Sequence, residues 1–112
     1  MAIKSKKINP DIHFRLLNAL EDEPHLTQRA LAKKLGISLG GVNYCLKALV
    51  EVGQIKMSNF ENNPNKLNYF YLLTPKGMKE KFLLTSEFLK RKMVQYNQLK
   101  QEIESIQSKI KL

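Results

Sequence analysis

Residues 27–52, TQRALAKKLGISLGGVNYCLKALVEV, hold two stretches of helical periodicity separated by one glycine. In the first stretch Leu31 and Leu35 lie on one helical face. Gly36 supplies the turn, because glycine adopts a left-handed backbone without steric cost. Thr27 and Ser38 are placed to cap the first and the second helix through their side-chain oxygens. The segment therefore predicts a helix-turn-helix.

The second of these helices has two distinct faces. Its buried stripe is predicted to contain the apolar residues Val42, Cys45, Leu46, Leu49 and Val50. Its opposite face carries Leu39, Gly40, Asn43, Tyr44 and Lys47. Asn43 can pair with an adenine edge, Tyr44 can touch a phosphate or a thymine methyl group, and Lys47 can reach a phosphate. This face suits a DNA major groove, and the alternative is the solvated side of an ordinary amphipathic helix.

The start of each helix offers further candidates. Gln28 and Arg29 stand at the N-terminus of the first helix, where backbone amides and the helix dipole favour a phosphate. Gly40 and Gly41 are unusual so early in a helix. They indicate either a close approach of the backbone to a phosphate or a position that needs no side chain.

The charge of the chain agrees with a polyanionic partner. Its 112 residues include 19 Lys and Arg against 10 Asp and Glu, a formal charge of +9, which favours nucleic acid because phosphate contacts release counterions. Cys45 is the single cysteine, so it excludes an intramolecular disulfide and a multi-thiolate zinc site. His13 and His25 are too scattered to bind a metal, and no nucleophile and base occur together. We expect neither an enzyme nor a cofactor.

One domain plus an appendage fits this length. Residues 1–8 are predicted to be a basic, flexible arm. No signal peptide or membrane span is evident, so we expect a cytoplasmic protein. Asn9-Pro10 then carries the cap and first-turn proline of a helix. Its apolar face is formed by Ile12, Leu16, Leu17 and Leu20.

A β-hairpin is predicted after Gly53. Ile55, Met57 and Phe60 begin an extended run, ENNPNK is a polar turn, and LNYFYLL is rich in residues that favour strands. A hairpin directly after a recognition helix is the wing of a winged helix-turn-helix, which would span residues 9–74. At its tip Asn63, Asn65 and Lys66 are candidates to contact the minor groove or the DNA backbone, or else form an ordinary solvated turn.

Thr74-Pro75 repeats the cap-and-proline signal and opens a C-terminal helical segment, residues 75–112. A straight helix of this length would span about 57 Å, against about 30 Å for a winged domain of this size. The helix must overhang, bend or find a partner. Because Thr85-Ser86-Glu87 offers a second cap, we expect a break or bend there.

The last part of this segment has a coiled-coil register. The predicted seam consists of Leu89, Tyr96, Leu99, Ile103, Ile106 and Ile110. Lys92 interrupts it, so little more than two heptads are regular. We expect the seam to form a homodimer; the alternative is that it folds back on its own domain. The basic run of Lys90, Arg91 and Lys92 is interpreted as a solvated helix face.

The strings VNYCLKAL and LTPKG, with FLKRKM further on, resemble MarR-like winged helix-turn-helix regulators, in particular their exopolysaccharide-associated subgroup. The resemblance implies a dimeric transcriptional regulator of surface-polysaccharide genes. It assigns recognition-helix contacts to Ser38, Asn43, Tyr44 and Lys47, and the wing tip to residues 63–66. This wing has no arginine, which predicts weaker minor-groove contacts. The N-terminal helix is shorter than is typical, so the C-terminal helix would have to supply the dimer contact.

The fold class expected is therefore mainly α, a winged helix-turn-helix with one small β-hairpin and a long C-terminal helix of coiled-coil character. The expected function is sequence-specific binding of double-stranded DNA by a homodimer at a pseudo-palindromic operator. One alternative is a protein-interaction or scaffold module that works through its coiled-coil segment. A winged helix that binds RNA is another. The sequence assigns no effector ligand.

Overall fold

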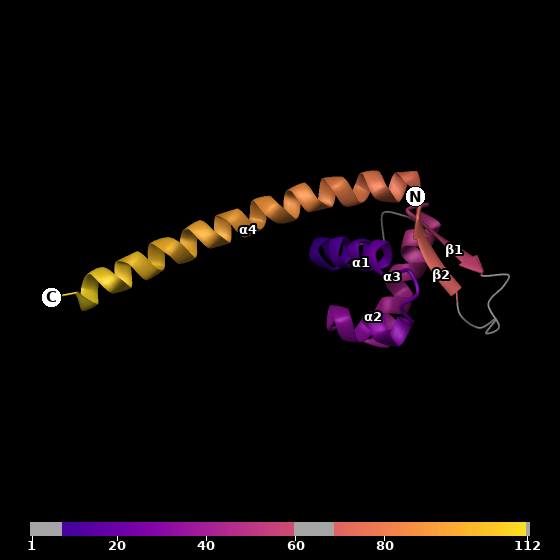
Figure 1. Cartoon of the computed structure of the whole chain (residues 1–112), viewed down its shortest axis with the longest axis horizontal. Helices are drawn as coiled ribbons and strands as arrows, with labels where there is room; N and C mark the ends of the chain where they lie inside the picture. Colours follow the sequence, from indigo (N-terminus) through magenta and orange to yellow (C-terminus); the bar gives the residue numbers. More distant parts are fainter. Residues whose placement is uncertain (1–7, 60–68, 112) are drawn as a thin grey trace.

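The computed structural model describes residues 8–59 and 69–111. It is elongated, measuring 69 × 34 × 23 Å, because one helix extends far beyond an otherwise compact domain (Figure 1). In chain order the elements are α1 Pro10–Asp22, α2 Gln28–Leu35, α3 Leu39–Glu51, β1 Ile55–Asn59, β2 Tyr69–Leu73 and α4 Pro75–Ile110. The predicted class, mainly helical with one hairpin and a long C-terminal helix, is confirmed.

Each helix in the described part of the chain begins at a side-chain cap. The side-chain oxygens of Asn9, Thr27, Ser38 and Thr74 accept hydrogen bonds from backbone amides in the first turns of α1, α2, α3 and α4, respectively. Such caps satisfy amides that have no partner inside the helix and contribute about 1 kcal/mol each. All four were predicted, because a cap depends only on residues two or three positions apart.

A leucine-rich core holds α1, α2 and α3 together. Its buried members include Leu16, Leu17, Leu20, Leu31, Leu35, Val42, Cys45, Leu46, Leu49 and Ile55. Ile8, placed by the sequence at the end of the N-terminal arm, packs against this core. The prediction for Val50 is wrong, since its side chain is 40% exposed. Val50 lies two helical turns after Asn43 and therefore shares the outer face of α3.

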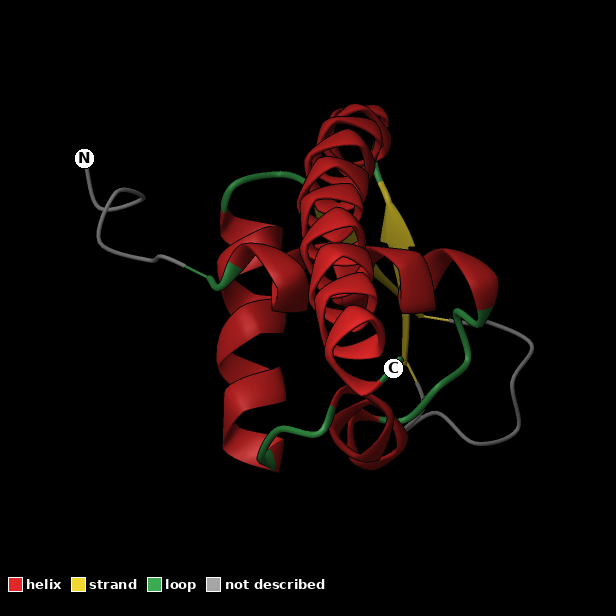
Figure 2. Cartoon of the chain, turned by 90° about the vertical axis from the view of Figure 1, so that its left-hand side faces the viewer, coloured by secondary structure: helices red, strands yellow, loops and turns green. Residues whose placement is uncertain are grey.

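The two strands form the predicted antiparallel hairpin. Ile55 pairs with Leu73 and Met57 pairs with Tyr71. Because alternate residues of a strand share a face, Met57 lies on the same side of the hairpin as the buried Ile55. The loop that joins the strands, residues 60–68, falls outside the described residues. Figure 2 shows the strands lying behind the helices when the molecule is viewed from the C-terminal end of α4.

The start of α4 is fixed to the turn between α3 and β1. The Thr74 amide donates to the Gln54 carbonyl oxygen at 3.0 Å, and the Thr74 hydroxyl donates to the Gly53 carbonyl at 2.5 Å. Lys76 Nζ donates to the Val52 carbonyl at 2.8 Å. Gly77 is buried so close to this turn that an added Cβ would lie 1.9 Å from the Gln54 carbonyl oxygen. Only glycine fits this approach.

Further along, α4 packs across α1. The rings of Phe14 and Phe88 stack with centroids 4.6 Å apart. Arg91 Nη2 lies 2.5 Å from an Asp11 carboxylate oxygen, and Lys81 forms an ion pair with Glu21. Arg91, predicted to lie on a solvated face, instead helps to hold α4 on α1.

The predicted break in α4 is absent, since the helix is continuous from Pro75 to Ile110. Thr85 Oγ1 donates to the Lys81 carbonyl at 2.7 Å, and Ser86 Oγ donates to the Phe82 carbonyl at 3.3 Å. The hydroxyls therefore bond back into the preceding turn and cap nothing. Such bonds bend helices slightly, and α4 bows gently along its length in Figure 1.

Beyond the winged domain, α4 projects with an exposed apolar stripe. The predicted seam residues are exposed as follows: Leu89 59%, Tyr96 59%, Leu99 55%, Ile103 46%, Ile106 55% and Ile110 73%. The stripe does not fold back on its own domain, because the C-terminal end of α4 points away from it (Figure 1). None of the helices described is long and apolar enough to cross a membrane.

Candidate nucleic-acid interface

The helix-turn-helix is formed by α2, a turn and α3. Gly36 ends α2 with φ of 71°, a left-handed conformation that other residues adopt only with strain. Three residues later α3 begins, capped by Ser38. The apolar side of α3 is buried in the core, so its polar side faces outward beside the hairpin.

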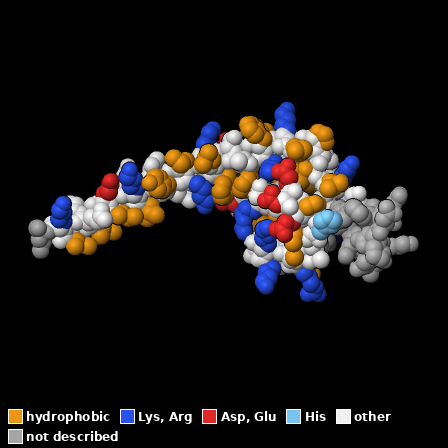
Figure 3. Space-filling view, in the orientation of Figure 1, with side chains coloured by type: hydrophobic (Ala, Val, Ile, Leu, Met, Phe, Trp, Pro, Cys, Tyr) orange, Lys and Arg blue, Asp and Glu red, His pale blue; other side chains and the backbone are white. Residues whose placement is uncertain are grey.

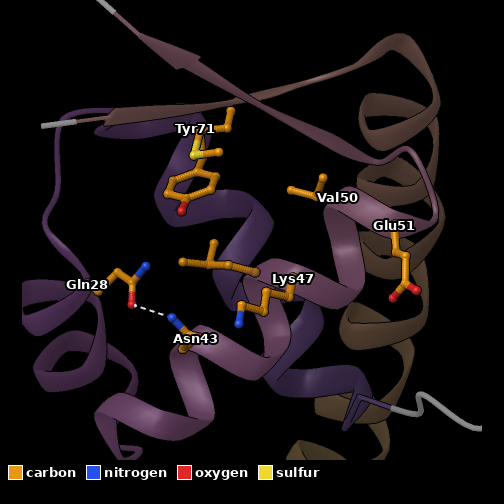
Figure 4. A pocket seen from close by; sticks show the side chains of 8 residues that line it. Gln28, Asn43, Lys47, Val50, Glu51 and Tyr71 are labelled. Atoms are coloured by element: carbon orange, nitrogen blue, oxygen red, sulfur yellow. Dashed lines mark hydrogen bonds between the residues drawn. The ribbon is translucent and has the colours of Figure 1, made fainter. Parts of the chain in front are cut away.

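Three of the predicted contact residues lie together in one groove. Gln28 enters from the first turn of α2, whereas Asn43 and Lys47 are one helical turn apart on α3. Together with Leu46, Val50, Glu51, Met57 and Tyr71 they line a groove of about 510 Å³ between α3 and the hairpin (Figure 4). The structure thus brings residues from α2, α3 and both strands to one surface.

Within this groove, Asn43 and Gln28 are bonded to each other. Asn43 Nδ2 donates to Gln28 Oε1 at 3.3 Å, and both side chains are half-buried. Glu51 lies at the far end of α3 from this pair, as Figure 4 shows. The two amides had been assigned separate partners, Asn43 a base and Gln28 a phosphate.

The apolar wall of the groove was not predicted. Val50 had been placed in the core, and Met57 and Tyr71 had been counted only as strand residues. The two-residue period of the strand would have shown that Met57 shares the side of the buried Ile55. No local signal places Tyr71 opposite Met57, because their pairing depends on the register of the hairpin.

The remaining candidates on the helix-turn-helix lie outside the groove. Arg29, Leu39, Gly40 and Tyr44 are exposed. Ser38 is also exposed; its hydroxyl oxygen accepts from the Gly41 amide at 3.0 Å, and its proton stays available for donation to a phosphate. Asn63, Asn65 and Lys66, the predicted wing-tip contacts, fall in the loop outside the described residues.

Gly40 has room for a side chain. A Cβ built there meets nothing nearer than the Ser38 hydroxyl oxygen at 4.0 Å. We therefore expect Gly40→Ala to raise the free energy of unfolding by as much as about 1 kcal/mol. If the backbone approaches DNA at this point, the same substitution should weaken DNA binding by about fivefold or more, since one close phosphate contact is lost. Thermal melting and a DNA titration of the same variant check both halves; unchanged affinity would show that DNA does not approach Gly40.

Basic side chains gather on the domain around α2. Figure 3 shows several of them projecting from the end of the domain where α2 lies. Lys33 and Lys34 occupy the last turn of α2, and Lys34 Nζ lies 2.7 Å from a Glu23 carboxylate oxygen. Because this pair is exposed, it restrains Lys34 little. Arg15, in contrast, donates to the carbonyls of Lys34 and Leu35 and caps the C-terminus of α2.

Cys45 belongs to the core. Its side chain is 7% exposed, and burial raises the pKa of its thiol. A reactive cysteine needs the opposite conditions, exposure and nearby positive charge. Over residues 8–59 and 69–111, no cluster of His, Cys, Asp and Glu could hold a metal ion.

Comparison with known proteins agrees with this geometry. Residues 10–56 match the family model described as winged helix-turn-helix DNA-binding. No curated protein matches the chain.

Several solved structures share its fold. The adhesin competence repressor AdcR from Streptococcus pyogenes is 22% identical with a TM-score of 0.66, over 88% of this chain and 70% of that one. A MepR variant from S. aureus is 23% identical with a TM-score of 0.65, over 96% and 77%. The PcaV transcriptional regulator from Streptomyces coelicolor is 16% identical with a TM-score of 0.61, over 87% and 79%. Residues 10–56 therefore form a winged helix-turn-helix domain, and the chain shares the fold of these solved structures.

Proposed function

We propose that this protein is a homodimeric transcriptional regulator that binds double-stranded DNA in a sequence-specific way. The observation that carries the proposal is the outer face of α3, where Asn43 and Lys47 stand one turn apart beside the hairpin. In this arrangement α3 would enter a major groove and the hairpin would lie over the flanking backbone. The charge of +9 supplies the attraction that does not depend on sequence.

The exposed stripe of α4 supports the dimer. Apolar residues at a coiled-coil spacing on a helix that projects from its domain need a partner to be buried. A second copy of the same helix offers a matching seam. Two winged domains related by a two-fold axis would then bind a pseudo-palindromic operator whose half-sites lie about one helical turn, or a multiple, apart.

The resemblance to the exopolysaccharide-associated subgroup suggests where to look for the operator. Promoters of surface-polysaccharide genes, together with the DNA upstream of the protein's own gene, are the first candidates. Repression by covering such a promoter is the simplest mode of action for a protein that occupies both half-sites.

A fluorescence-anisotropy titration tests the proposal. The native upstream fragment and a shuffled duplex of the same composition are each titrated at two salt concentrations. We expect tighter binding to the native fragment at both. Equal binding that falls steeply with salt for both duplexes would leave only the attraction of a basic protein to a polyanion, and would favour the protein-interaction module instead.

Asn43 and Lys47 should differ in their contribution to DNA binding. Lys47→Ala is expected to weaken all sequences alike and to lower the slope of log affinity against log salt by about 1, because it removes one phosphate contact. Asn43→Ala is expected to cost about 1–3 kcal/mol of discrimination at one base pair. Titrations against the operator and single-base variants measure both effects. If Lys47→Ala instead reduced discrimination and Asn43→Ala weakened all sequences alike, Lys47 would be the residue that reads the base and Asn43 the one that contacts a phosphate.

A further inference from the structure

We propose that Gln28 is a positioning residue that holds the Asn43 amide in the orientation needed to read an adenine. The inference rests on the proposed function, since it assigns the means by which α3 distinguishes one base. Gln28 belongs to α2 and Asn43 to α3. The base-reading group would therefore be built from both helices of the motif.

The hydrogen bond between the two amides has a direction that matters. Asn43 Nδ2 carries two protons, and the bond to Gln28 Oε1 uses one of them. An asparagine reads adenine through its carboxamide oxygen and one amide proton together, accepting from N6 and donating to N7. With Gln28 as acceptor, the amide oxygen and the second proton of Asn43 are both left for the base.

A free asparagine side chain would have to be ordered when it meets DNA. The terminal torsion of asparagine is broad, so an unsupported amide samples both faces. Holding it in one orientation beforehand removes that cost and excludes the flipped amide, which would present its donor and acceptor in the wrong order. The same bond therefore serves both affinity and discrimination.

The lining of the groove holds two other side chains that could accept, Tyr71 and Glu51, but Asn43 is hydrogen-bonded to Gln28. Leu46, Val50 and Met57 form the apolar part of the groove wall (Figure 4). Lys47, the nearest lining cation along α3, can donate but cannot accept from Asn43 Nδ2. Among the residues that line this groove, Gln28 is the one to which Asn43 is bonded.

Two substitutions of Gln28 distinguish a role in orienting the Asn43 amide from a direct contact between Gln28 and DNA. Gln28→Met keeps the length of the side chain but removes the acceptor. Gln28→Glu keeps an acceptor for Asn43 Nδ2 and adds a negative charge facing DNA. Gln101→Met, on an exposed turn of α4 away from the seam, makes the same chemical change as Gln28→Met at a distant site and serves as the matched control.

The first measurement uses the free protein. In an NMR spectrum of side-chain amides, the Asn43 signals are identified by their loss in Asn43→Ala. We expect Gln28→Met to shift them and to speed the exchange of one proton with solvent, whereas Gln28→Glu keeps that proton protected. Signals that are the same in wild type and Gln28→Met would overturn the positioning role, whatever the protein does with DNA.

The second measurement is the base preference of each variant, obtained by titrating duplexes with all four base pairs at each operator position. Asn43→Ala should remove the base preference at one operator position. At that position the wild-type protein should prefer adenine by about fivefold or more. Gln28→Met should reduce that preference to under about threefold, and Gln28→Glu should keep it while weakening all duplexes. The control Gln101→Met should match wild type.

The outcomes distinguish this inference from the function on which it rests. A wild-type protein without any base preference would overturn both. A wild-type preference that Gln28→Met retains would overturn only the positioning role. A uniform loss of affinity in Gln28→Met, with preference intact, would assign Gln28 to a phosphate contact instead.

Discussion

Gly77→Ala should detach the start of α4 from the turn between α3 and β1. The added methyl carbon would lie 1.9 Å from the Gln54 carbonyl oxygen and 2.9 Å from its carbon. Both atoms belong to the backbone, so no side-chain rotation can relieve the overlap. We expect a loss of roughly 3 kcal/mol or more in the free energy of unfolding, corresponding to a fall of about 10 °C or more in the melting temperature.

Circular-dichroism melting measures this loss, and Gly40→Ala is its natural control. Both variants add the same methyl group near the start of a helix, but at Gly40 nothing lies closer than 4.0 Å. Gly40→Ala should therefore melt at the wild-type temperature or above it. A Gly77→Ala variant as stable as wild type would mean that α4 does not approach Gln54 this closely.

The proposed homodimer should become a monomer when Ile103 and Ile106 are both replaced by aspartate. Both side chains lie on the exposed stripe of α4, at 46% and 55% exposure. In a dimer seam, four carboxylates would be buried close together, and burying that much like charge is prohibitive. Light scattering should give half the wild-type mass. Affinity for a palindromic operator should fall by about a hundredfold or more, because the second half-site no longer binds intramolecularly.

A charge-matched control tests whether two added negative charges on α4 are enough to change the mass, wherever they are placed. Gln101→Asp with Ser105→Asp adds the same two charges to exposed residues of α4 on the side away from the seam. This variant should keep the wild-type mass. An unchanged mass in the Ile103 and Ile106 double variant would reject the dimer through α4, even if DNA binding were reduced.

Local signals in the sequence predicted most of the elements correctly. Asn9, Thr27, Ser38 and Thr74 marked the helix starts, since a cap and its amide lie in the same turn. The hairpin was evident from its strand-forming runs on either side of an Asn/Pro loop. The exposed seam of α4 followed from its heptad spacing, because a 36-residue helix is longer than the domain that could cover it.

The candidate interface was predicted only in part. Asn43 and Lys47 could be assigned to the outer face of α3 from periodicity alone. Val50 could have been assigned to the same face, since it lies two turns after Asn43. The meeting of Met57 with Tyr71 could not, because it depends on the register of the hairpin. Gln28 is 15 positions from Asn43 along the chain, and no pattern in the sequence indicates that their amides meet.

Thr85 and Ser86 show why the course of α4 could not be predicted. A threonine or serine hydroxyl can cap a new helix or bond back to a carbonyl of the preceding turn, and the sequence permits both. Contacts with α1 lie on both sides of this point, through Lys81 before it and Phe88 after it. These contacts hold α4 in place on either side, and the hydroxyls bond back to carbonyls of the continuous helix.

The sequence by itself determined the type and order of the elements, most of the residues that α1, α2 and α3 bury, and the position of the second helix of the helix-turn-helix. These properties follow from periods of two to four residues, over which neighbours in the chain are also neighbours in space. Tertiary structure alone decided the pairing of Gln28 with Asn43, the meeting of Met57 with Tyr71, the glycine-only contact at Gly77 and the direction in which α4 projects. Each of these arises where segments far apart in the chain are packed together, and local energetics does not specify such contacts.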